Sequence, residues 1–258
     1  MKKIWIAAVA ATAMSVPASA AVIDFTNVKA TWFDPIGGSG ITYSGNGTSS
    51  ASVSWGTSQG QGKSGYDFVV ASIPSITVNP PSGSAEGIVG TFTHRNNPIS
   101  SGTSISGIKL KFQTDVLIDG DAYGNVTFIY DFSHLETPNS ATPCANGGFN
   151  GFGINNNGCA DRVQVNFNSQ SDYFTINEGG IDYNYAVDVV GFLIGGNPAV
   201  NFWTREQANN HADARGKVVL YSQAVNGVPE PATWAMLIAG FGMVGAAARR
   251  GRTARTAA

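Results

Sequence analysis

Charged residues are scarce in this chain, and several of the basic ones stand at its two ends. Only 12% of the 258 residues are Asp, Glu, Lys or Arg, and the formal net charge is −2. Without Lys2, Lys3, Glu230 and the four arginines of the last ten residues, 9 basic and 16 acidic residues remain, a net charge near −7. Nucleic acid and anionic membrane surfaces attract basic patches. The composition therefore argues against nucleic acid as a partner and is compatible with polysaccharide or cations.

Long apolar runs are also missing, since neither terminal stretch has the roughly 20 residues that a stable membrane span needs. The first, Ile4–Val16, follows a basic tip and leads to Ala18-Ser19-Ala20. These three parts are typical of a secretory signal peptide. We predict that residues 1–20 are this signal, that the Sec translocase exports the chain, and that signal peptidase cleaves between Ala20 and Ala21. A buried N-terminal helix is the alternative.

The second apolar stretch, Trp234–Ala248, ends at a cluster of arginines. Its 15 residues give about 22 Å of helix, less than the roughly 30 Å of a hydrocarbon layer. Arg249, Arg250 and two further arginines stay on the cytoplasmic side because moving them across the bilayer is costly. Pro229 and Pro231 place an extended stretch before the helix. The pattern predicts a transmembrane helix that the membrane holds transiently; a plain transmembrane anchor is the alternative.

The tail resembles a bacterial sorting tag in the order of its parts. Pro229-Glu230-Pro231 is followed by Trp234-Ala235, the apolar helix and Arg249-Arg250. This arrangement is similar to the PEP-CTERM signal in its PEP-x-x-W-A form, over residues 227–258. The resemblance implies that an exosortase, a membrane-embedded cysteine transpeptidase of Gram-negative bacteria that make exopolysaccharide, recognises the Pro-Glu-Pro residues. The chain would then pass through the inner membrane and reach the periplasm, the outer surface or the extracellular biofilm matrix.

Cysteine is nearly absent, with Cys144 and Cys159 as its two occurrences. An even number in an exported chain argues for one disulfide rather than for a metal site or a catalytic thiol. The bridge would close a loop of about 15 residues, worth roughly 3 kcal/mol by chain entropy. The enclosed sequence is rich in Gly and Asn and would otherwise adopt many conformations.

Apolar residues of the body alternate with polar ones, with a period of two. The alternation is clearest at Ile108–Phe112, Val126–Phe132, Val163–Phe167 and Tyr183–Val189. Such a period is typical of strands with one buried face. Further strands are expected at Val22–Val28, Ser52–Trp55, Tyr66–Ala71, Gly87–Thr93 and Lys217–Ala224. Residues 21–226 therefore predict one exported all-β domain, an antiparallel, jelly-roll-like β-sandwich of about nine or ten strands.

Three segments depart from this pattern. Residues Thr204–His211 predict one short helix. The Gly- and Ser-rich segment Pro35–Gly65 is either a long loop or two weak edge strands. Asn226–Gly227 is the linker between the domain and the tail.

One unusual string in the body is GTFTHRNNPIS, from Gly90 to Ser100. It predicts a strand that ends in a turn, where Thr93 and Asn96 bond nearby backbone groups. Thr93, His94 and Asn96 match the tetrapeptide of the THxN family of PEP-CTERM proteins. The chain resembles that family over most of the body, including the ETPN segment and the cysteine loop. The resemblance implies an exported β-rich domain and supplies no activity.

The histidines of the body admit two interpretations. A lone His94 beside Thr and Asn favours a structural hydrogen-bonding role at the turn over catalysis. His134 and Glu136 lie two apart on one strand face, a spacing that can chelate a metal. Together with His94 they would form a three-ligand site. That site requires adjacent strands, which the sequence does not show.

An acidic turn is the candidate for weak calcium binding, and no other cofactor is expected. In IDGDAYGN, Asp119, Asp121 and Gly124 match positions 1, 3 and 6 of an EF-hand-like loop. The match fails at positions 5 and 12, where Tyr123 and Tyr130 stand. Asp-Gly is also a favoured hairpin turn, which is the interpretation that we prefer.

Aromatic residues of the body leave room for sugar binding. Trp32, Trp55, Tyr123 and Trp203 can stack on sugar rings or fill the core. Paired carboxylates for glycoside hydrolysis need a spatial closeness that a sequence does not show. We read the chain as a non-enzymatic surface protein, structural or adhesive and associated with exopolysaccharide. The alternatives are a carbohydrate-binding module, assisted by calcium, and a polysaccharide-modifying hydrolase.

Overall fold

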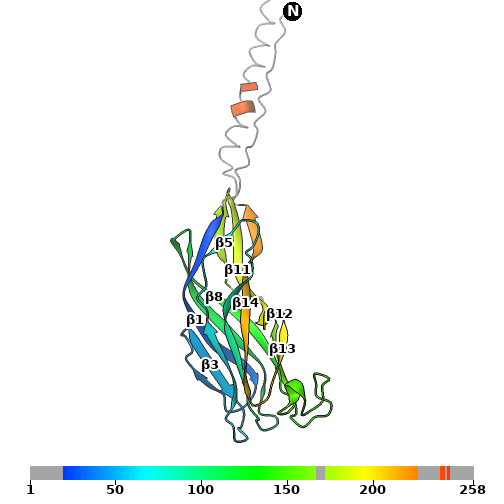
Figure 1. Cartoon of the computed structure of the whole chain (residues 1–258). Helices are drawn as coiled ribbons and strands as arrows, with labels where there is room; N and C mark the ends of the chain where they lie inside the picture. The colour runs from blue at the N-terminus through cyan, green and yellow to red at the C-terminus, as the bar shows by residue number, and fades with distance from the viewer. Residues whose placement is uncertain (1–19, 167–171, 226–238, 242, 245–258) are drawn as a thin grey trace, which may run out of the picture.

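The computed structural model describes residues 20–166, 172–225, 239–241 and 243–244. Its strands form two antiparallel sheets around one hydrophobic core. Strand β1 (Ala21–Gly37) starts, and strand β14 (Ala208–Val225) ends, at the same end of an elongated domain (Figure 1). The loop that connects β8 (Asp121–Leu135) to β9 (Asp161–Asn166) lies at the opposite end (Figure 1).

The first sheet has six strands in the order β13-β9-β8-β7-β1-β5. Its remaining members are β5 (Ile76–Val78), β7 (Ile105–Ile118) and β13 (Asn201–Thr204). The alternation predicted for β7 and β8 holds, because Leu110, Phe112 and Phe128 point into the core while their neighbours are partly exposed. Phe112 and Phe128 face each other across the hairpin.

The second sheet has the order β10-β11-β14-β6-β4-β3-β2, and β12 pairs with β11 beside it. Its members other than β14 are β2 (Thr42–Ser44), β3 (Ser50–Trp55), β4 (Ser64–Val70), β6 (Gly87–Asn96), β10 (Phe174–Glu178), β11 (Ile181–Ile194) and β12 (Asn197–Ala199). The segment Pro35–Gly65 thus contains strands, and the edge-strand interpretation is confirmed for β2 at the end of this sheet.

Strand β1 is longer than the predicted Val22–Val28 because two irregularities keep it paired with β7. Asn27 and Asp34 both have φ of 53°, a left-handed conformation that Asn and Asp tolerate better than other side chains. The register of β1 against β7 shifts at these two places. These bulges let one strand continue along the sheet.

Aromatic side chains from both sheets meet in the core. Phe92 of β6 stacks on Phe132 of β8 with ring centroids 5.5 Å apart, and Trp32 of β1 approaches Tyr66 of β4 at 5.6 Å. Contacts of this kind join the two sheets across their inner faces. The predicted all-β, antiparallel class is confirmed; the jelly-roll-like connectivity stays a prediction.

The short helix predicted at Thr204–His211 is wrong. Strand β13 ends at Thr204, a turn follows with Gln207 at φ 57°, and β14 starts at Ala208. Ala212 pairs with Phe92 of β6 and is buried. The long ladder with β6 overrides the local helical composition, as tertiary pairing often does.

The predicted signal peptide, the linker and nearly all of the sorting segment lie outside the described residues. Ala20 is exposed, and Ala21 is the first residue of β1, so cleavage between them stays a prediction. Among the residues that the structure covers, no helix has both the length and the apolar character to cross a membrane.

Candidate functional site

Two histidines and three carboxylates meet at the end of the core next to the β8–β9 loop. His94 comes from β6, His134 from β8 and Asp161 from the start of β9, and one ligand atom of each lies within 4.8 Å of the others. The same limit joins carboxylate oxygens of Asp161, Glu136 and Glu206. Because β6 and β8 belong to different sheets, the cluster connects the two layers. We call these five residues the histidine–carboxylate cluster.

The hydrogen bonds of His94 fix the position of its proton. The Thr204 hydroxyl donates to the Asp161 carbonyl oxygen at 3.1 Å, which uses its single proton. It therefore accepts a hydrogen bond from Nδ1 of His94 at 2.9 Å. Neutral His94 then carries its proton on Nδ1 and a lone pair on Nε2. Burial, followed by the nearby His134 and Arg95, lowers the pKa of His94 well below its ordinary value.

His134 lies between a phenol and a carboxylate. Its Nδ1 is 2.7 Å from the Tyr66 hydroxyl, and its Nε2 is 3.3 Å from Oε2 of Glu136. The imidazole is fully buried, whereas 23% of the Glu136 side chain is exposed. With Nε2–H donating to Glu136, Nδ1 accepts from Tyr66; with the proton on Nδ1, the roles reverse and Nε2 offers a lone pair. Burial raises the pKa of Tyr66 well above its ordinary value, so the phenol keeps its proton.

Two of the carboxylates are buried without a compensating charge. Oδ1 of Asp161 accepts from the Thr137 backbone N–H at 2.7 Å, but Oδ2 has no hydrogen-bond partner within the described residues. Burial, and then Glu136, raises the pKa of Asp161 to about 9. Burial and Glu136 likewise raise the pKa of Glu206 to about 7, although the neighbouring Asn139 and Gln207 act in the opposite direction.

No lysine or arginine pairs with these carboxylates in the part of the chain that the structure describes. The basic side chains with ion-pair partners use carboxylates elsewhere, as Arg95 does with Asp67 at 2.8 Å and Lys109 with Asp34 at 2.6 Å. Buried charges in proteins are normally paired or coordinate metals. The cluster therefore either holds protons on its carboxyl groups or binds a cation.

The three matching residues of the THxN string take two different environments. The Thr93 hydroxyl faces the outside of β6 and contacts Nδ1 of His211 at 2.8 Å. His94 and Asn96 point inward and are fully buried, and Nδ2 of Asn96 donates to the Thr204 carbonyl oxygen at 3.1 Å. The expected bonds to nearby backbone at a turn are wrong, because partners of Thr93 and Asn96 lie more than 100 residues away in the sequence.

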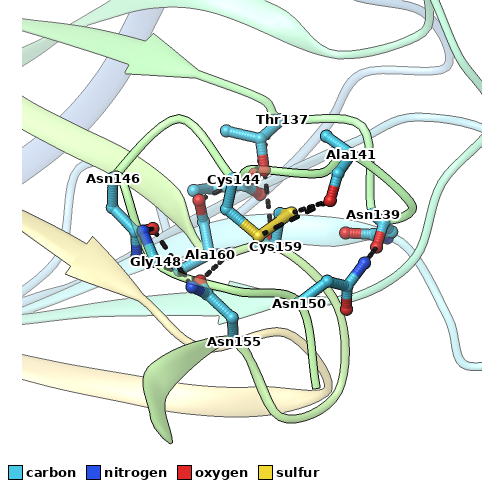
Figure 2. Close-up of a disulfide and its surroundings, with 11 residues drawn as sticks. Thr137, Asn139, Ala141, Cys144, Asn146, Gly148, Asn150, Asn155, Cys159 and Ala160 are labelled. Carbon is cyan, nitrogen blue, oxygen red and sulfur yellow. Dashed lines mark hydrogen bonds between the residues drawn. A yellow bond between two sulfur atoms is a disulfide. The ribbon is translucent and has the colours of Figure 1, made fainter. Parts of the chain in front are cut away.

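The disulfide is confirmed, and it braces the loop whose two ends carry cluster residues. Cys144 and Cys159 are bonded, with their Cα atoms 5.3 Å apart. Figure 2 shows the Thr137 hydroxyl directed at the end of the loop, where it donates to the Cys159 and Ala160 carbonyl oxygens at 3.0 and 3.1 Å. Asn155 accepts from Ala160 N–H at 2.9 Å. These bonds hold the chain just before Asp161.

The acidic turn at Asp119 and Asp121 is the β7–β8 hairpin turn. Asp119 and Gly120 have φ of 53° and 87°, the left-handed values that a two-residue hairpin requires. Oδ1 of Asp119 accepts from the Val22 backbone N–H at 2.8 Å. The hairpin interpretation is thus confirmed for the backbone, and calcium binding by Asp119 and Asp121 stays a prediction.

The sequence contains a Gly-x-Ser-x-Gly string, Gly56 to Gly60, which has the lettering of a hydrolase nucleophile elbow. The elbow requires a strand-to-helix turn. Here Ser58 lies in the loop between β3 and β4, both of them strands. Its hydroxyl accepts from the Gly60 and Gly62 backbone N–H groups. The string is therefore a turn within the second sheet.

The four aromatic candidates for sugar binding divide between core and surface. Trp32 and Trp55 are buried, and Trp55 stacks near His94 with ring centroids 6.1 Å apart. Trp203 is half-buried, with the Arg162 guanidinium 5.9 Å from its ring centroid. Tyr123 is exposed, so it alone of the four is clearly accessible to a polymer.

The sequence offered His94, His134 and Glu136 as one possible three-ligand site without showing that they are adjacent, and it did not indicate Asp161 or Glu206. The predicted strand Val163–Phe167 did not reach Asp161, where β9 starts. Glu206 lies in the segment that was predicted to be a helix. The predicted sorting-signal residues lie outside the described residues; they are Pro229, Glu230, Pro231, Trp234, Ala235, Arg249 and Arg250.

Comparisons with known proteins bear on the tail. A search of curated proteins finds no match for this chain. Residues 227–252 match the PEP-CTERM protein-sorting motif. The chain therefore carries the signal for exosortase-directed sorting of an exported protein.

Proposed function

We propose that this chain is a non-enzymatic surface protein of the exopolysaccharide matrix, delivered by an exosortase and attached to the matrix through its β8–β9 loop. The observation that carries the proposal is that the sorting motif and the β8–β9 loop follow from opposite ends of the elongated domain. Strand β14, whose last residue Val225 precedes the sorting motif, ends at one end of the domain, and the disulfide-braced loop lies at the other (Figure 1). A protein handled by its tail would present this loop outward.

The loop offers apolar contact surface at its tip. Phe149 and Phe152 are 71% and 74% exposed, and aromatic rings stack on the apolar faces of sugar rings. In the same loop, Asn155 is buried and accepts a hydrogen bond from the Asn146 side chain at 3.0 Å. The two rings are therefore presented by a constrained loop, which lowers the entropy lost on binding.

A non-enzymatic role is supported by the placement of the acidic groups. The carboxylates of Glu136, Asp161 and Glu206 lie within 4.8 Å of one another, closer than the roughly 5 to 9.5 Å between the carboxyl groups of glycosidases. Asp161 and Glu206 are fully buried, so a polymer cannot reach them. The hydrolase reading is the weakest of the three.

The attachment test compares retention in the matrix. Changing Phe149 and Phe152 together to Ala should release the exported protein from purified exopolysaccharide in a sedimentation assay. Val69, an exposed apolar residue of β4, provides the matched control as Val69→Ala. Equal sedimentation of the double variant and the wild type would refute attachment through this loop.

The finer sorting assignment is tested separately. We propose the PEP-x-x-W-A form of the signal and membership of the THxN family, on the strength of Pro229-Glu230-Pro231, Trp234-Ala235 and the Thr93-His94-x-Asn96 string. Replacing the three Pro-Glu-Pro residues by Ala should leave the protein at full length in the inner membrane. If mass spectrometry finds the same processed mass in this variant as in the wild type, the exosortase does not recognise these three residues.

A carbohydrate-binding module is the second candidate, favoured by three tyrosines near the other end. Tyr123, Tyr173 and Tyr221 are partly exposed; the rings of Tyr173 and Tyr221 lie 4.9 Å apart, and the Tyr123 hydroxyl reaches the Tyr173 carbonyl oxygen at 3.5 Å. In this case changing the three tyrosines to Ala abolishes binding of soluble oligosaccharide, and the Phe149/Phe152 variant keeps it. If oligosaccharide binding is also lost when calcium is removed and in the Asp119→Asn variant, calcium assists that binding.

A further inference from the structure

We propose that the histidine–carboxylate cluster is a structural site for one divalent transition-metal ion, bound by His94 Nε2, His134 Nε2 and Asp161 Oδ2. Glu136 supplies the fourth ligand, and Glu206 faces the ion from the β13–β14 turn. The THxN histidine thereby acquires a chemical role. This inference does not depend on how the protein is sorted or attached.

The first support is a pair of buried ligand atoms that the fold leaves without partners. Neither Nε2 of His94 nor Oδ2 of Asp161 has a hydrogen-bond partner in the described part of the chain, and both residues are 0% exposed. An unsatisfied buried polar atom costs roughly 1–3 kcal/mol, and more when charged. The two residues belong to different sheets, and ligand atoms of both lie within 4.8 Å of each other and of His134. A bound cation would satisfy both at once.

The second support is the set of bonds that orient the ligands from behind. Thr204 holds Nδ1 of His94, Tyr66 contacts Nδ1 of His134, and the Thr137 N–H holds the other oxygen of Asp161. Metal-binding histidines in proteins almost always donate their second ring N–H to an oxygen in this way, which fixes the ring and its tautomer. In both histidines this arrangement leaves Nε2 for the ion, with the His134 proton moved to Nδ1.

The third support is charge. The cluster brings three carboxyl groups into a buried region that no described lysine or arginine enters by an ion pair. A dication beside them lets the carboxylates ionise, because it replaces the water that burial removes. The competing arrangement, in which the carboxyl groups keep protons and the histidines stay metal-free, is an outcome of the test below.

The ligand types select the ion. Imidazole nitrogen and carboxylate oxygen suit zinc and neighbouring transition metals, whereas calcium takes oxygen ligands only. Ligand atoms about 2.0–2.2 Å from one tetrahedral ion lie about 3.3–3.6 Å apart. The atoms of His94, His134 and Asp161, which lie within 4.8 Å of one another, would move closer together by at most about 1.5 Å on binding. Because the ion would connect β6 to β8 and β9, its role is to tie the two sheets together beside the disulfide loop.

The test measures metal uptake by the full chain purified from its exporting host. After dialysis against a chelator, the protein is titrated with Zn²⁺ and, for its spectrum, with Co²⁺. We expect one equivalent of either ion and visible absorption typical of tetrahedral Co²⁺. Asp161→Asn and His94→Gln should weaken zinc binding by about 100-fold or more, and Thr204→Val, which removes a positioning group, by about 10- to 100-fold.

The matched control is the third histidine of the chain. His211 lies on the outer side of β14 and contacts Thr93, so His211→Gln should bind zinc as the wild type does. If His94→Gln does not fold, Asp161→Asn and the wild-type Co²⁺ spectrum decide. The proposal is overturned if the folded wild type takes up less than about one tenth of an equivalent at millimolar zinc, or if Asp161→Asn and wild type bind equally.

Discussion

The two ends of the core bury different chemistry. At the end of the domain where β1 starts and β14 ends, the core is apolar: Phe25 packs edge-to-face on Phe128 and Phe174, with ring centroids 6.4 and 6.1 Å apart. A pocket of about 380 Å³ opens beside Phe25, Phe128 and Tyr130. Toward the disulfide loop, the same two sheets enclose His94, His134 and carboxylates instead.

This contrast separates two ways of holding sheets together. Apolar packing is non-directional and depends little on ions, so the end around Phe128 should respond to volume alone. The polar end needs each buried group to find a partner, so its contribution should depend on what binds there. The two ends can therefore be distinguished by whether their contribution to stability changes when zinc is added or removed.

The largest effect is expected at the apolar end. Phe128 is buried between β7, β1 and the second sheet, so Phe128→Ala removes contacts and leaves a cavity. We expect the free energy of unfolding to fall by about 3–5 kcal/mol, measured by urea titration. The loss should be equal with zinc and with chelator. A loss that changes with zinc would show that the two ends are not independent.

The next effect comes from metal removal at the polar end. With zinc at about 100 to 1,000 times its Kd, binding adds about 2.7–4.1 kcal/mol to the stability of the folded state. Chelation should therefore lower Tm by about 5–15 °C in a domain of this size. Scanning calorimetry with and without chelator measures the shift. An unchanged Tm would mean that the polar end binds no metal and that its carboxyl groups keep their protons.

Much of the fold could be predicted because a strand with one buried face shows alternating apolar and polar residues in its local sequence. The alternations around Leu110, Phe128 and Val163 lie on one buried face each, as expected. The segment after Thr204 was misread because its composition suits a helix and its strand is imposed by pairing with β6. Local pattern fails where the deciding contacts are distant in sequence.

The polar end could be predicted only in part for the same reason. His134 and Glu136 stand two apart in the sequence, and the strand that carries His134 ends at Leu135, just before Glu136. His94 and Asp161 come from β6 and β9, segments that share no motif with β8. Glu206 reaches the cluster from a turn, where no period indicates burial. Adjacent strands and a buried turn are properties of the topology, which one sequence does not display.

The disulfide gives a third, intermediate effect. Cys144→Ser with Cys159→Ser opens a loop of sequence separation 15 and should cost about 3 kcal/mol by chain entropy. Because Thr137 ties the loop end to Asp161, zinc affinity should fall as well. Calorimetry and zinc titration of the double variant measure both. Thiols that react with alkylating reagent in the unreduced wild type would contradict the bridge itself.

The smallest effect, and the sharpest test of the comparison, is Asp161→Asn in metal-free protein. At about pH 3 Asp161 is protonated in the folded chain, where its pKa is about 9, and largely protonated in the unfolded chain, so a neutral amide of the same shape should change stability there by less than about 1 kcal/mol. The unfolded carboxyl ionises above about pH 4, so the wild type loses stability as pH rises from about 4 to 9.

The Asn variant lacks that loss while keeping the groups that face position 161, which are Glu136, Glu206, His94 and His134. Chelator-treated Asp161→Asn should therefore become the more stable protein as pH rises, and zinc should reverse the order. Urea titrations at several pH values, each with and without zinc, measure the difference between the two proteins. A difference that keeps one sign in both conditions would mean that Asp161 stabilises the core by packing, as Phe128 does.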